Sequence, residues 1–451
     1  MSEGLSRRDL ALLAAMFAVT ALFYCLVLFR YPIIYGIDGP YYLIQVRSIL
    51  ETGFMTYYDP PFCFYFFSLL ALILGDVTVA VKLGTAFFCA LTVIPAYLIG
   101  RRLTLSPPAA ISCATVTSLS PGLISLSGEF VKNAVGSFFL LCFVYFCLRI
   151  LKGDDKRVTK VTALAALLLT AATHILDLGL ALLYLILMSI GAFVFRTNRR
   201  GFLAFSLPLL VGCAVLGGAA YFVYAGYTID IGKGLTFAQD FLQSLEEYDV
   251  IDSGEIIGSR VPAIVGTVGG VVALALYRRR GKNVEVAFVS ASVLVLVLLN
   301  FPTIPREWAW RFMLMSFVPM SQIAGGLVGL LTEHDVQWGM AALLVSFFVL
   351  TQTLSAWNRP RPVLSPQEYS DMVEMAGHVP TGSKVVGMPQ SRYWIEYLLR
   401  SQIFRPSSDE QVNYTVYFIA GPRSPSVPPG STLILRGAVL SLFALHPRRP
   451  A

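Results

Sequence analysis

The sequence predicts a polytopic, all-α membrane protein with about eleven membrane-spanning helices, followed by a small α/β module at the C-terminal end. Of the 451 residues, 56% are hydrophobic and only 14% are charged, whereas soluble domains carry roughly 25% charged residues. The basic residues stand in short runs between long apolar blocks, and twelve of the 25 prolines lie after residue 356. This composition excludes an ordinary soluble enzyme, a disordered chain and a protein that binds nucleic acid.

The first apolar block, residues 10–29, is expected to be an uncleaved membrane helix. It follows Arg7 and Arg8, and no small-x-small cleavage site comes after it, so it does not resemble a signal peptide. A membrane helix needs about 20 mainly apolar residues, and ten further blocks approach this length. They cover residues 78–100, 107–125, 130–151, 158–175, 177–195, 202–224, 261–278, 285–300, 311–331 and 338–356.

The distribution of charge predicts how these spans are oriented. Loops assigned to the cytoplasm hold fifteen Lys and Arg residues, whereas the outer loops before the C-terminal module hold seven. In membrane proteins, the excess of basic residues lies in the cytoplasmic loops. We therefore expect an integral protein of the cell membrane with a cytoplasmic N-terminus, and eleven spans place the C-terminus outside.

Two outer segments of the 1–356 membrane domain are long. Residues 30–77 form the first outer loop, and their apolar part, residues 62–74, is too short to cross a bilayer. We expect that part to be a helix lying along the membrane interface. Residues 225–260 carry seven acidic residues and are expected to be a solvated face.

Residues 357–451 form the predicted extracytoplasmic module. A proline-rich linker is followed by alternating helix and strand patterns, and a stretch of this size is near the lower limit for an independent core. Asn413 begins a glycosylation sequon, a weak sign of an outer location. We expect helices at 367–377 and 393–400 and strands at 383–388, 412–420 and 431–437.

The cysteines give no sign of a disulfide scaffold or a metal site. They form neither a CxxC pair nor a set with zinc spacing. We expect them to be small buried hydrophobic side chains, and we expect no resident metal or other cofactor. The seven lie in apolar stretches at Cys25, Cys63, Cys89, Cys113, Cys142, Cys147 and Cys213.

Ionisable groups at the outer ends of the spans are the candidates for chemistry, because such groups are costly at membrane depth and tend to pair or to serve a function. Asp38, in GIDGPYY, follows the first span and begins a helix. It is either a capping aspartate or a reactive carboxylate. Arg47 and Glu51 follow on that helix with the i, i+4 spacing of a surface ion pair.

Two further pairs have i, i+3 spacing at outer turns. Glu129 and Lys132 lie between the third and fourth spans, and His174 and Asp177 lie between the fifth and sixth. The first pair is either an intrahelical ion pair or part of a binding site. The second is either a proton relay or a satisfied polar turn, of which we favour the turn.

Arg306 and Arg311, in PREWAWRFM, begin the tenth span. Their guanidinium groups suit bidentate binding of a phosphate, although Trp308 and Trp310 beside them also fit an interfacial anchor. All these sites fall on the same predicted side of the membrane, whereas the cytoplasmic loops contain no Walker A motif, no glycine-rich nucleotide fingerprint and no HExxH. The outer face is therefore the predicted active face.

The first outer loop, IDGPYYLIQVRSILETGFMTYYDPPFCFYFFSLL, resembles that of the GT-C superfamily of membrane glycosyltransferases. In that superfamily an acidic residue, a D-P-P or H-P-P turn, an interfacial helix and a basic inner end of the second span follow one another. Here they correspond to Asp38, residues 59–61, residues 62–74 and Arg101-Arg102. The loop is similar to those of protein mannosyltransferases and oligosaccharyltransferase catalytic subunits. PREWAWRFMLMSFVP and LSPGLISLSGEFVKNAVG are similar to elements of lipid-linked-sugar and archaeal-type transferases.

The resemblance implies a glycosyltransferase of the hexosyltransferase type, acting in glycosylation of the cell envelope. It would move a sugar from a polyprenyl-phosphate or dolichyl-phosphate donor to a glycan, lipid or protein acceptor on the extracytoplasmic face, with inversion. Asp38 is then the candidate base. Arg311 and Arg306, with Lys132, would stabilise the leaving phosphate. The candidates for binding sugar or acceptor hydroxyls are Glu129, His174, Asp177 and Arg47.

The sequence departs from the superfamily pattern at two points. No D-x-D or D-E pair accompanies Asp38, so we do not expect the metal-binding form of the first loop, and the W-W-D signature of oligosaccharyltransferases is absent. Three alternatives stay open: oligosaccharyltransferase-like transfer of a glycan to protein, a flippase or transporter of a lipid-linked sugar, and a non-catalytic scaffold whose C-terminal region binds a partner. Against the transporter, the two halves show no clear internal repeat, and the charged groups lie at the rim rather than near the midplane.

Overall fold

A computed structural model describes residues 5–223, 236–237, 239–240, 242–243, 253–332, 351–403, 415–422 and 427–446. The chain divides into two compact units. The bundle unit comprises Met1–Val27, Tyr58–Cys63 and Thr85–Arg359, and the loop–sheet unit comprises Leu28–Tyr57, Phe64–Gly84 and Pro360–Ala451. The division passes through the helices α1 (Arg7–Leu28), α3 (Phe62–Leu74) and α4 (Val77–Leu91).

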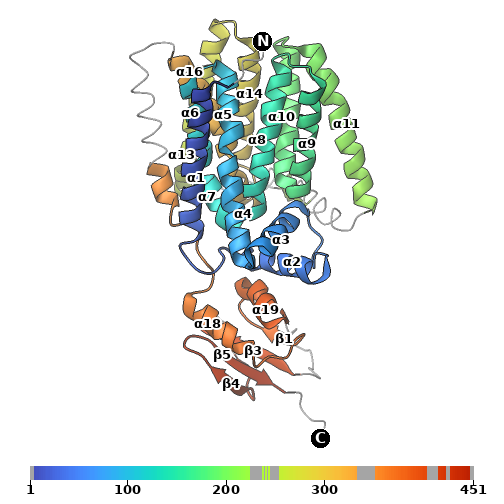
Figure 1. The fold of residues 1–451 in the computed structure, drawn as a ribbon, viewed down its shortest axis with the longest axis vertical. Helices are drawn as coiled ribbons and strands as arrows, with labels where there is room; N and C mark the ends of the chain where they lie inside the picture. The colour runs from blue at the N-terminus through green and yellow to red at the C-terminus, as the bar shows by residue number, and fades with distance from the viewer. Residues whose placement is uncertain are drawn as a thin grey trace. The chain divides into compact units, whose positions relative to one another are not determined.

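The bundle unit is built from helices that run alongside one another (Figure 1). In the described residues, eight segments are long and apolar enough to cross a membrane, and each coincides with an expected span. Besides α1 and α4, the helices are α5 (Val93–Thr104), α6 (Pro107–Ser118), α7 (Pro121–Glu129), α8 (Val131–Leu151), α9 (Arg157–Thr173), α10 (Ile175–Val194), α11 (Arg199–Val223), α13 (Ser253–Arg279), α14 (Asn283–Leu299), α15 (Arg306–Leu314) and α16 (Phe317–Leu331).

Three of the eleven expected spans are not among those eight segments. The spans expected at 158–175 and 285–300 are helices α9 and α14, each of 17 residues, which is at the short end for crossing a bilayer. The span expected at 338–356 lies mostly outside the described residues, as does most of the acidic loop 225–260. The count of eleven therefore stays a prediction.

A break between two helices divides the third membrane segment, Pro107–Glu129. The hydroxyl of Ser120 accepts a hydrogen bond from the N–H of Leu123 at 3.1 Å and so caps the start of α7. Pro121 occupies the first turn, where its missing N–H leaves no helical hydrogen bond unmade. This local chemistry ends α6 and directs the short helix α7 toward the turn that carries Glu129.

Glycines let helices of the bundle approach to backbone distance. A Cβ at Gly100 of α5 would lie 2.5 Å from the carbonyl oxygen of Ala109 in α6, and a Cβ at Gly122 of α7 would collide with the carbonyl oxygen of Leu314 in α15. Membrane helices rely on such small residues because lipid supplies no hydrophobic drive between them. Gly122 therefore sets how closely α15 can approach α7.

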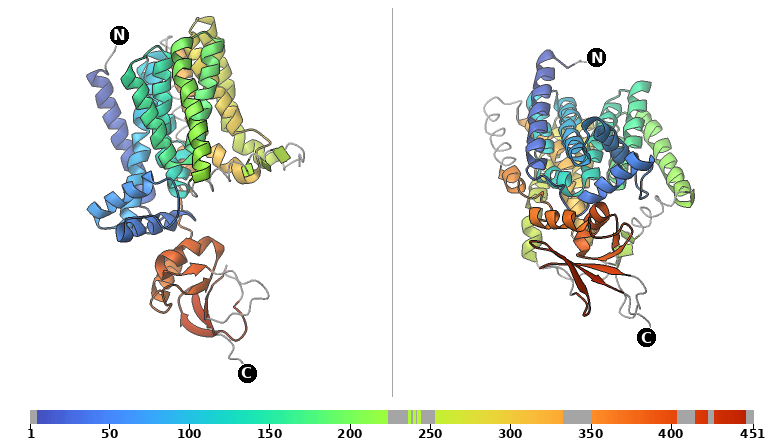
Figure 2. Two further views of the ribbon diagram at one scale, coloured as in Figure 1. Left: turned by 90° about the vertical axis from the view of Figure 1, so that its right-hand side faces the viewer. Right: turned by 60° about the horizontal axis from the view of Figure 1, so that its bottom comes forward.

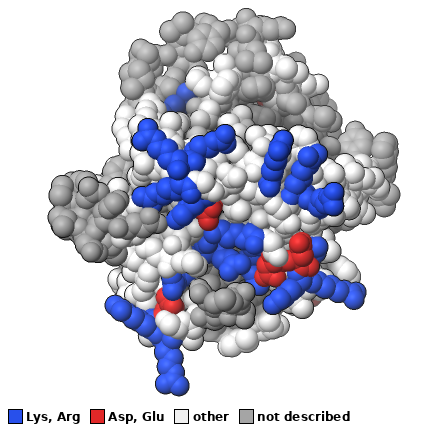
Figure 3. Space-filling model, turned by 90° about the horizontal axis from the view of Figure 1, so that it is seen from above, with Lys and Arg blue, Asp and Glu red and all other residues white. Residues whose placement is uncertain are grey.

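Basic side chains gather at one end of the bundle unit (Figure 3). The opposite ends of the same helices carry the residues expected on the outer face: α8 starts beside Lys132, and His174 follows the last residue of α9. The helix termini at the basic end carry Arg101 and Arg102 on α5, Arg149 on α8, Arg157 on α9, Arg199 and Arg200 on α11, and Arg278 and Arg279 on α13.

The loop–sheet unit contains a five-stranded mixed sheet of order β2-β1-β3-β5-β4. Strand β1 pairs in parallel with β2 and β3, and β5 pairs antiparallel with β3 and β4. Two helices lie together on one side of this sheet (Figure 2). The elements are α2 (Gly39–Thr52), α18 (Pro366–Met375), α19 (Arg392–Leu399), β1 (Lys384–Val386), β2 (Gln402–Ile403), β3 (Val416–Ala420), β4 (Thr432–Arg436) and β5 (Ser441–Leu445).

These elements overlap the helices and strands expected after residue 366, and α3 has the bounds expected for the interfacial helix. The sequence analysis missed β2 and β5. β2 has only two residues, too few for an alternating pattern, and β5 was not separated from the strand pattern before it. The sequon at Asn413 lies outside the described residues.

A buried aspartate fastens α18 to the turn between β4 and β5. The carboxylate of Asp371, on α18, accepts hydrogen bonds of 2.7–2.9 Å from the N–H groups of Ala438, Val439 and Leu440. Burial acts to raise the pKa of this carboxyl, but the three N–H donors outweigh it and the pKa lies below its usual value. The ionised form therefore stabilises this part of the fold.

Replacing this carboxylate should loosen the β4–β5 hairpin. We expect Asp371→Asn to lower the free energy of opening this hairpin by roughly 1.5–3 kcal/mol, which is the contribution of a hydrogen bond to a charged group. The measurement is hydrogen exchange of peptides covering 432–445 in the full chain, with Glu374→Gln on the same helix as control. Because the native pKa is lowered, protection in the unsubstituted chain should fall as the pH drops below about 4. Equal exchange in both variants would contradict this role.

Candidate functional site

The turn between α7 and α8 collects most of the candidate residues of the bundle unit. The helix breaks at Phe130, whose φ of −132° and ψ of 62° are not helical. Glu129 therefore ends one helix while Lys132 begins the next, and the expectation of an intrahelical i, i+3 pair is wrong. Lys132 instead forms an ion pair and a hydrogen bond with Asp59 from the 58–63 segment.

Three other groups contact this turn. The Glu129 carboxylate interacts with the indole of Trp310 and with the guanidinium of Arg359. The guanidinium of Arg311 lies over the ring of Phe130, 4.9 Å from its centroid. The turn thus brings three cations, on Lys132, Arg311 and Arg359, together with the carboxylates of Asp59 and Glu129. We call these five residues the turn cluster.

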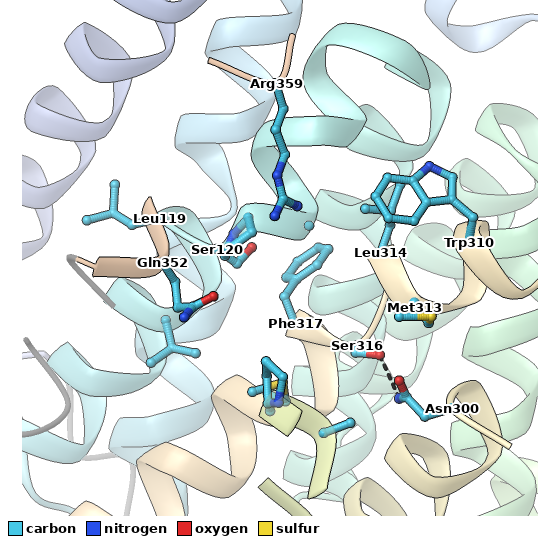
Figure 4. A pocket seen from close by; sticks show the side chains of 16 residues that line it. Leu119, Ser120, Asn300, Trp310, Met313, Leu314, Ser316, Phe317, Gln352 and Arg359 are labelled. Atoms are coloured by element: carbon cyan, nitrogen blue, oxygen red, sulfur yellow. Dashed lines mark hydrogen bonds between the residues drawn. The ribbon is translucent and has the colours of Figure 1, made fainter. Parts of the chain in front are cut away.

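A mainly apolar pocket of about 250 Å³ opens beside the turn cluster. Its walls come from α6, α7, α13, α15, α16 and residues 352–359. In Figure 4 the side chain of Arg359 extends toward Ser120 and Phe317, and Trp310 lies across from it. Deeper in the wall, Asn300 donates a hydrogen bond to Ser316 at 2.9 Å. The pocket therefore combines apolar walls with a guanidinium and an indole.

His174 and Asp177 lie at the start of α10 in the same unit. The Nδ1 atom of His174 accepts the N–H of Leu176 at 3.2 Å and lies 3.3 Å from an Asp177 carboxylate oxygen. Asp177 is fully buried, and neither of its carboxylate oxygens accepts a hydrogen bond from another described residue. The favoured expectation was a polar turn with all its hydrogen bonds made. The Asp177 carboxylate does not meet that expectation.

Two contacts relate this His–Asp pair to the turn cluster. Gly136 on α8 makes room for Asp177, since a Cβ at that position would collide with the carboxylate. The fully buried Cys63 lies close enough to Asp59, Lys132 and Asp177 to interact electrostatically with all three. The bundle unit thus gathers Glu129, Lys132, Arg311, His174 and Asp177, five of the residues expected from the sequence.

Two further residues of the PREWAWRFM segment, Arg306 and Trp308, lie on α15 together with Arg311. Arg306 begins α15, and its side chain lies outside the described residues. The indole of Trp308 donates a hydrogen bond of 3.4 Å to Asp240 and packs edge-on against Phe237, 5.3 Å between centroids. Trp308 is therefore engaged with protein groups, and a binding role for Arg306 stays a prediction.

Asp38 and Arg47 belong to the loop–sheet unit. Asp38 precedes α2, but its side chain makes no capping hydrogen bond. It is half-buried. Burial raises the pKa of Tyr393 on α19, and the charge of the Asp38 carboxylate helps to raise it. Arg47 donates a hydrogen bond of 2.6 Å to the carbonyl of Tyr397 and lies over that ring, 4.7 Å from its centroid. The expected partner of Arg47, Glu51, instead pairs with Arg400 at 3.0 Å.

Asp59 and Arg359 are members of the turn cluster that the sequence analysis did not place in the site. Asp59 carried a signal, because it opens the D-P-P turn that was noted as a motif. Arg359 carried none beyond its position in a proline-rich linker. Among the described residues, no three His, Cys, Asp or Glu side chains gather as they would around a metal ion. The seven cysteines are free.

The chain is similar to known proteins both in sequence and in fold. Residues 58–221 match the family model of dolichyl-phosphate-mannose-protein mannosyltransferase. No curated protein matches the chain significantly. The oligosaccharyltransferase of Archaeoglobus fulgidus aligns with a TM-score of 0.59 at 15% identity, over 86% of this chain and 61% of that one. Arabinofuranosyltransferase AftD from Mycobacteria aligns with a TM-score of 0.55 at 14% identity, over 99% of this chain and 40% of that one.

This chain spans less than two thirds of the length of either solved structure. At these identities the likeness establishes the fold. The range that matches the family model contains Asp59, the turn between α7 and α8, and the His174–Asp177 pair. The chain therefore has the fold of the GT-C membrane glycosyltransferases, and residues 58–221 carry the sequence pattern of the dolichyl-phosphate-mannose-protein mannosyltransferase family.

Proposed function

We propose that this protein is an integral membrane glycosyltransferase that moves a sugar, a hexose in our reading, from a polyprenyl-phosphate-linked donor to an acceptor on the extracytoplasmic face. The observation that carries the proposal is the turn cluster beside a mainly apolar pocket. Cations next to apolar walls suit a ligand that joins a phosphate to an isoprenoid chain. The matching family is named after a dolichyl-phosphate-linked sugar, which belongs to this ligand class.

The cations of the turn cluster would serve the leaving group. Negative charge builds on the phosphate as its bond to the anomeric carbon breaks, and preorganised cations stabilise that charge. Arg311 offers a bidentate contact, Lys132 a point charge held by Asp59, and Arg359 a second guanidinium at the pocket. Arg306 is retained as a further candidate because it begins the same helix as Arg311.

Asp38 is the proposed base. The acceptor hydroxyl attacks the anomeric carbon, its proton passes to the Asp38 carboxylate, and the phosphate departs with the electron pair of the broken C–O bond. One such displacement inverts the anomeric centre. Glu129, His174 and Asp177 would bind sugar or acceptor hydroxyls, as would Arg47 if it leaves Tyr397. The acceptor is a glycan, a lipid or a protein, and we propose no cofactor.

The basic end of the bundle supports an orientation for the proposed enzyme. Lys and Arg cluster at the cytoplasmic ends of membrane helices. On α8, Lys132 of the turn cluster lies in the first turn and Arg149 of the basic end lies in the last turn. We therefore propose eleven spans, a cytoplasmic N-terminus and an extracytoplasmic module after residue 356. In this orientation the turn cluster faces the outside.

Cysteine labelling tests the orientation. Thr381→Cys is exposed in the proposed outer module, and Lys156→Cys is exposed at the basic end. An impermeant thiol reagent should label the first variant in intact cells and the second only after lysis, above the background of the unsubstituted chain. The reverse pattern would invert the orientation and move the turn cluster to the cytoplasm.

The phosphate role of Arg311 predicts a graded effect of substitution. We expect Arg311→Ala to lower kcat/KM for the donor by about thirtyfold or more, because losing a close charged contact costs roughly 2–5 kcal/mol. Arg311→Lys should lose less, since it keeps the charge and gives up only the planar fork. The assay is transfer of labelled sugar from a polyprenyl-phosphate donor, with Arg157→Ala at the basic end as control. Equal activity in all variants would rule out the contact.

The role of Asp38 predicts loss of turnover without loss of fold. Because Asn has nearly the shape of Asp and begins a helix about equally well, Asp38→Asn should leave the amount of folded protein unchanged. Transfer per folded molecule should fall by roughly 10²–10⁴-fold, the usual contribution of a general base, while donor binding persists. A rate near that of the unsubstituted chain would exclude Asp38 as the base.

A further inference from the structure

Three tyrosines of the loop–sheet unit form a continuous aromatic platform. Tyr41 comes from α2, Tyr57 from the segment after α2, and Tyr393 from α19. The rings of Tyr41 and Tyr57 stack with centroids 5.6 Å apart and planes at 27°, and Tyr41 meets Tyr393 at 5.2 Å with planes at 54°. Tyr57 is 37% exposed, so part of the platform is open to a ligand.

Charged groups edge the platform. The hydroxyl of Tyr57 donates a hydrogen bond of 2.6 Å to the Glu396 carboxylate. The exposed guanidinium of Arg392 lies over the Tyr393 ring, 4.2 Å from its centroid, and donates a hydrogen bond of 2.7 Å to the Tyr393 hydroxyl. The platform therefore carries one acceptor group and one donor group at its rim, both from α19.

A buried amide holds the platform rigid. Gln45, which is fully buried, donates to the backbone carbonyl of Tyr57 at 2.8 Å and accepts the N–H of Tyr57 at 3.0 Å. The same Gln45 amide also donates to the Tyr41 hydroxyl at 3.1 Å. Gln45 thus holds the Tyr41 hydroxyl and the Tyr57 backbone, while Glu396 holds the Tyr57 hydroxyl. Ordering these two tyrosines before a ligand arrives lowers the ordering cost of binding.

We propose that Tyr41, Tyr57 and Tyr393, with Glu396 and Arg392, form a carbohydrate subsite that holds the acceptor of the reaction. The C–H faces of a pyranose ring pack on aromatic rings, and its hydroxyls need donors and acceptors at the rim of such a surface. The platform supplies all of these. The subsite rests on the proposed glycosyl transfer, and it assigns to the acceptor a sugar ring next to the reacting hydroxyl.

The position of Asp38 favours the acceptor over the donor as the occupant. Asp38 immediately precedes α2, three residues before Tyr41, and its carboxylate acts electrostatically on Tyr393, so the candidate base lies near the platform within the same unit. An acceptor hydroxyl must reach the base to lose its proton.

Direct binding of simple sugars tests the subsite without requiring turnover. The probes are methyl glucopyranoside, methyl mannopyranoside and methyl galactopyranoside, observed by saturation-transfer NMR with the full chain in detergent. We expect a signal from at least one of them with the unsubstituted chain and with Asp38→Asn. The signal should be lost in Tyr57→Leu and largely kept in Tyr57→Phe, which retains the ring. The control is Tyr65→Leu, an exposed tyrosine of α3 outside the platform.

Kinetics give a second readout. Tyr57→Leu should raise the KM for acceptor by roughly tenfold, the scale of one lost aromatic contact, with the KM for donor unchanged. Sugar binding that depends on Tyr57 supports the subsite even if no transfer is found, in which case the proposed function fails alone. Transfer with an unchanged acceptor KM and no sugar binding overturns the subsite alone. Equal losses in Tyr57→Leu and Tyr65→Leu would indicate interfacial anchoring and also overturn it.

Discussion

The ion pair between Lys132 and Asp59 is the contact on which the polar end of the bundle unit depends. Both side chains are largely buried, at 17% and 11% exposure, and removing one partner of such a pair leaves a charge that costs roughly 3–5 kcal/mol. The pair ties the D-P-P turn to the start of α8. Phe62, two residues after that turn's first proline, packs edge-on against Phe139 of α8 at 5.0 Å. These two contacts fix the position of the D-P-P turn relative to the first turns of α8.

Helix ends, rather than helix interiors, carry the candidate site residues of this bundle. A charged side chain at membrane depth is costly, whereas a helix end offers water, backbone dipoles and neighbouring termini. The non-helical Phe130 separates Glu129 from Lys132, so each points to a different partner. Gly122 lets α15 come close enough for Arg311 to reach the same turn. The site is thus a consequence of where helices stop.

The two units divide the proposed chemistry between them. The bundle unit holds the apolar pocket and the cations suited to a lipid phosphate. The loop–sheet unit holds Asp38 and a rigid platform of tyrosines, in which α2 and α19 contribute rings from distant parts of the chain. A donor that stays in the membrane and an acceptor that arrives from water require surfaces of different polarity. We propose that the two units provide these two surfaces.

Apolar length and charge are local properties of the chain, and from them the sequence alone predicted a helical membrane protein, the bounds of α3 and the eight segments that are long and apolar enough to cross a membrane. It also identified most residues of the turn cluster, since an ionisable group beside an apolar block is unusual wherever it occurs. Their partners were decided only by the tertiary structure. Spacing alone paired Glu129 with Lys132 and Arg47 with Glu51, yet Lys132 binds Asp59 and Glu51 binds Arg400. Helical spacing predicts a pair only while one helix continues and no better partner approaches from elsewhere, and both conditions depend on long-range packing.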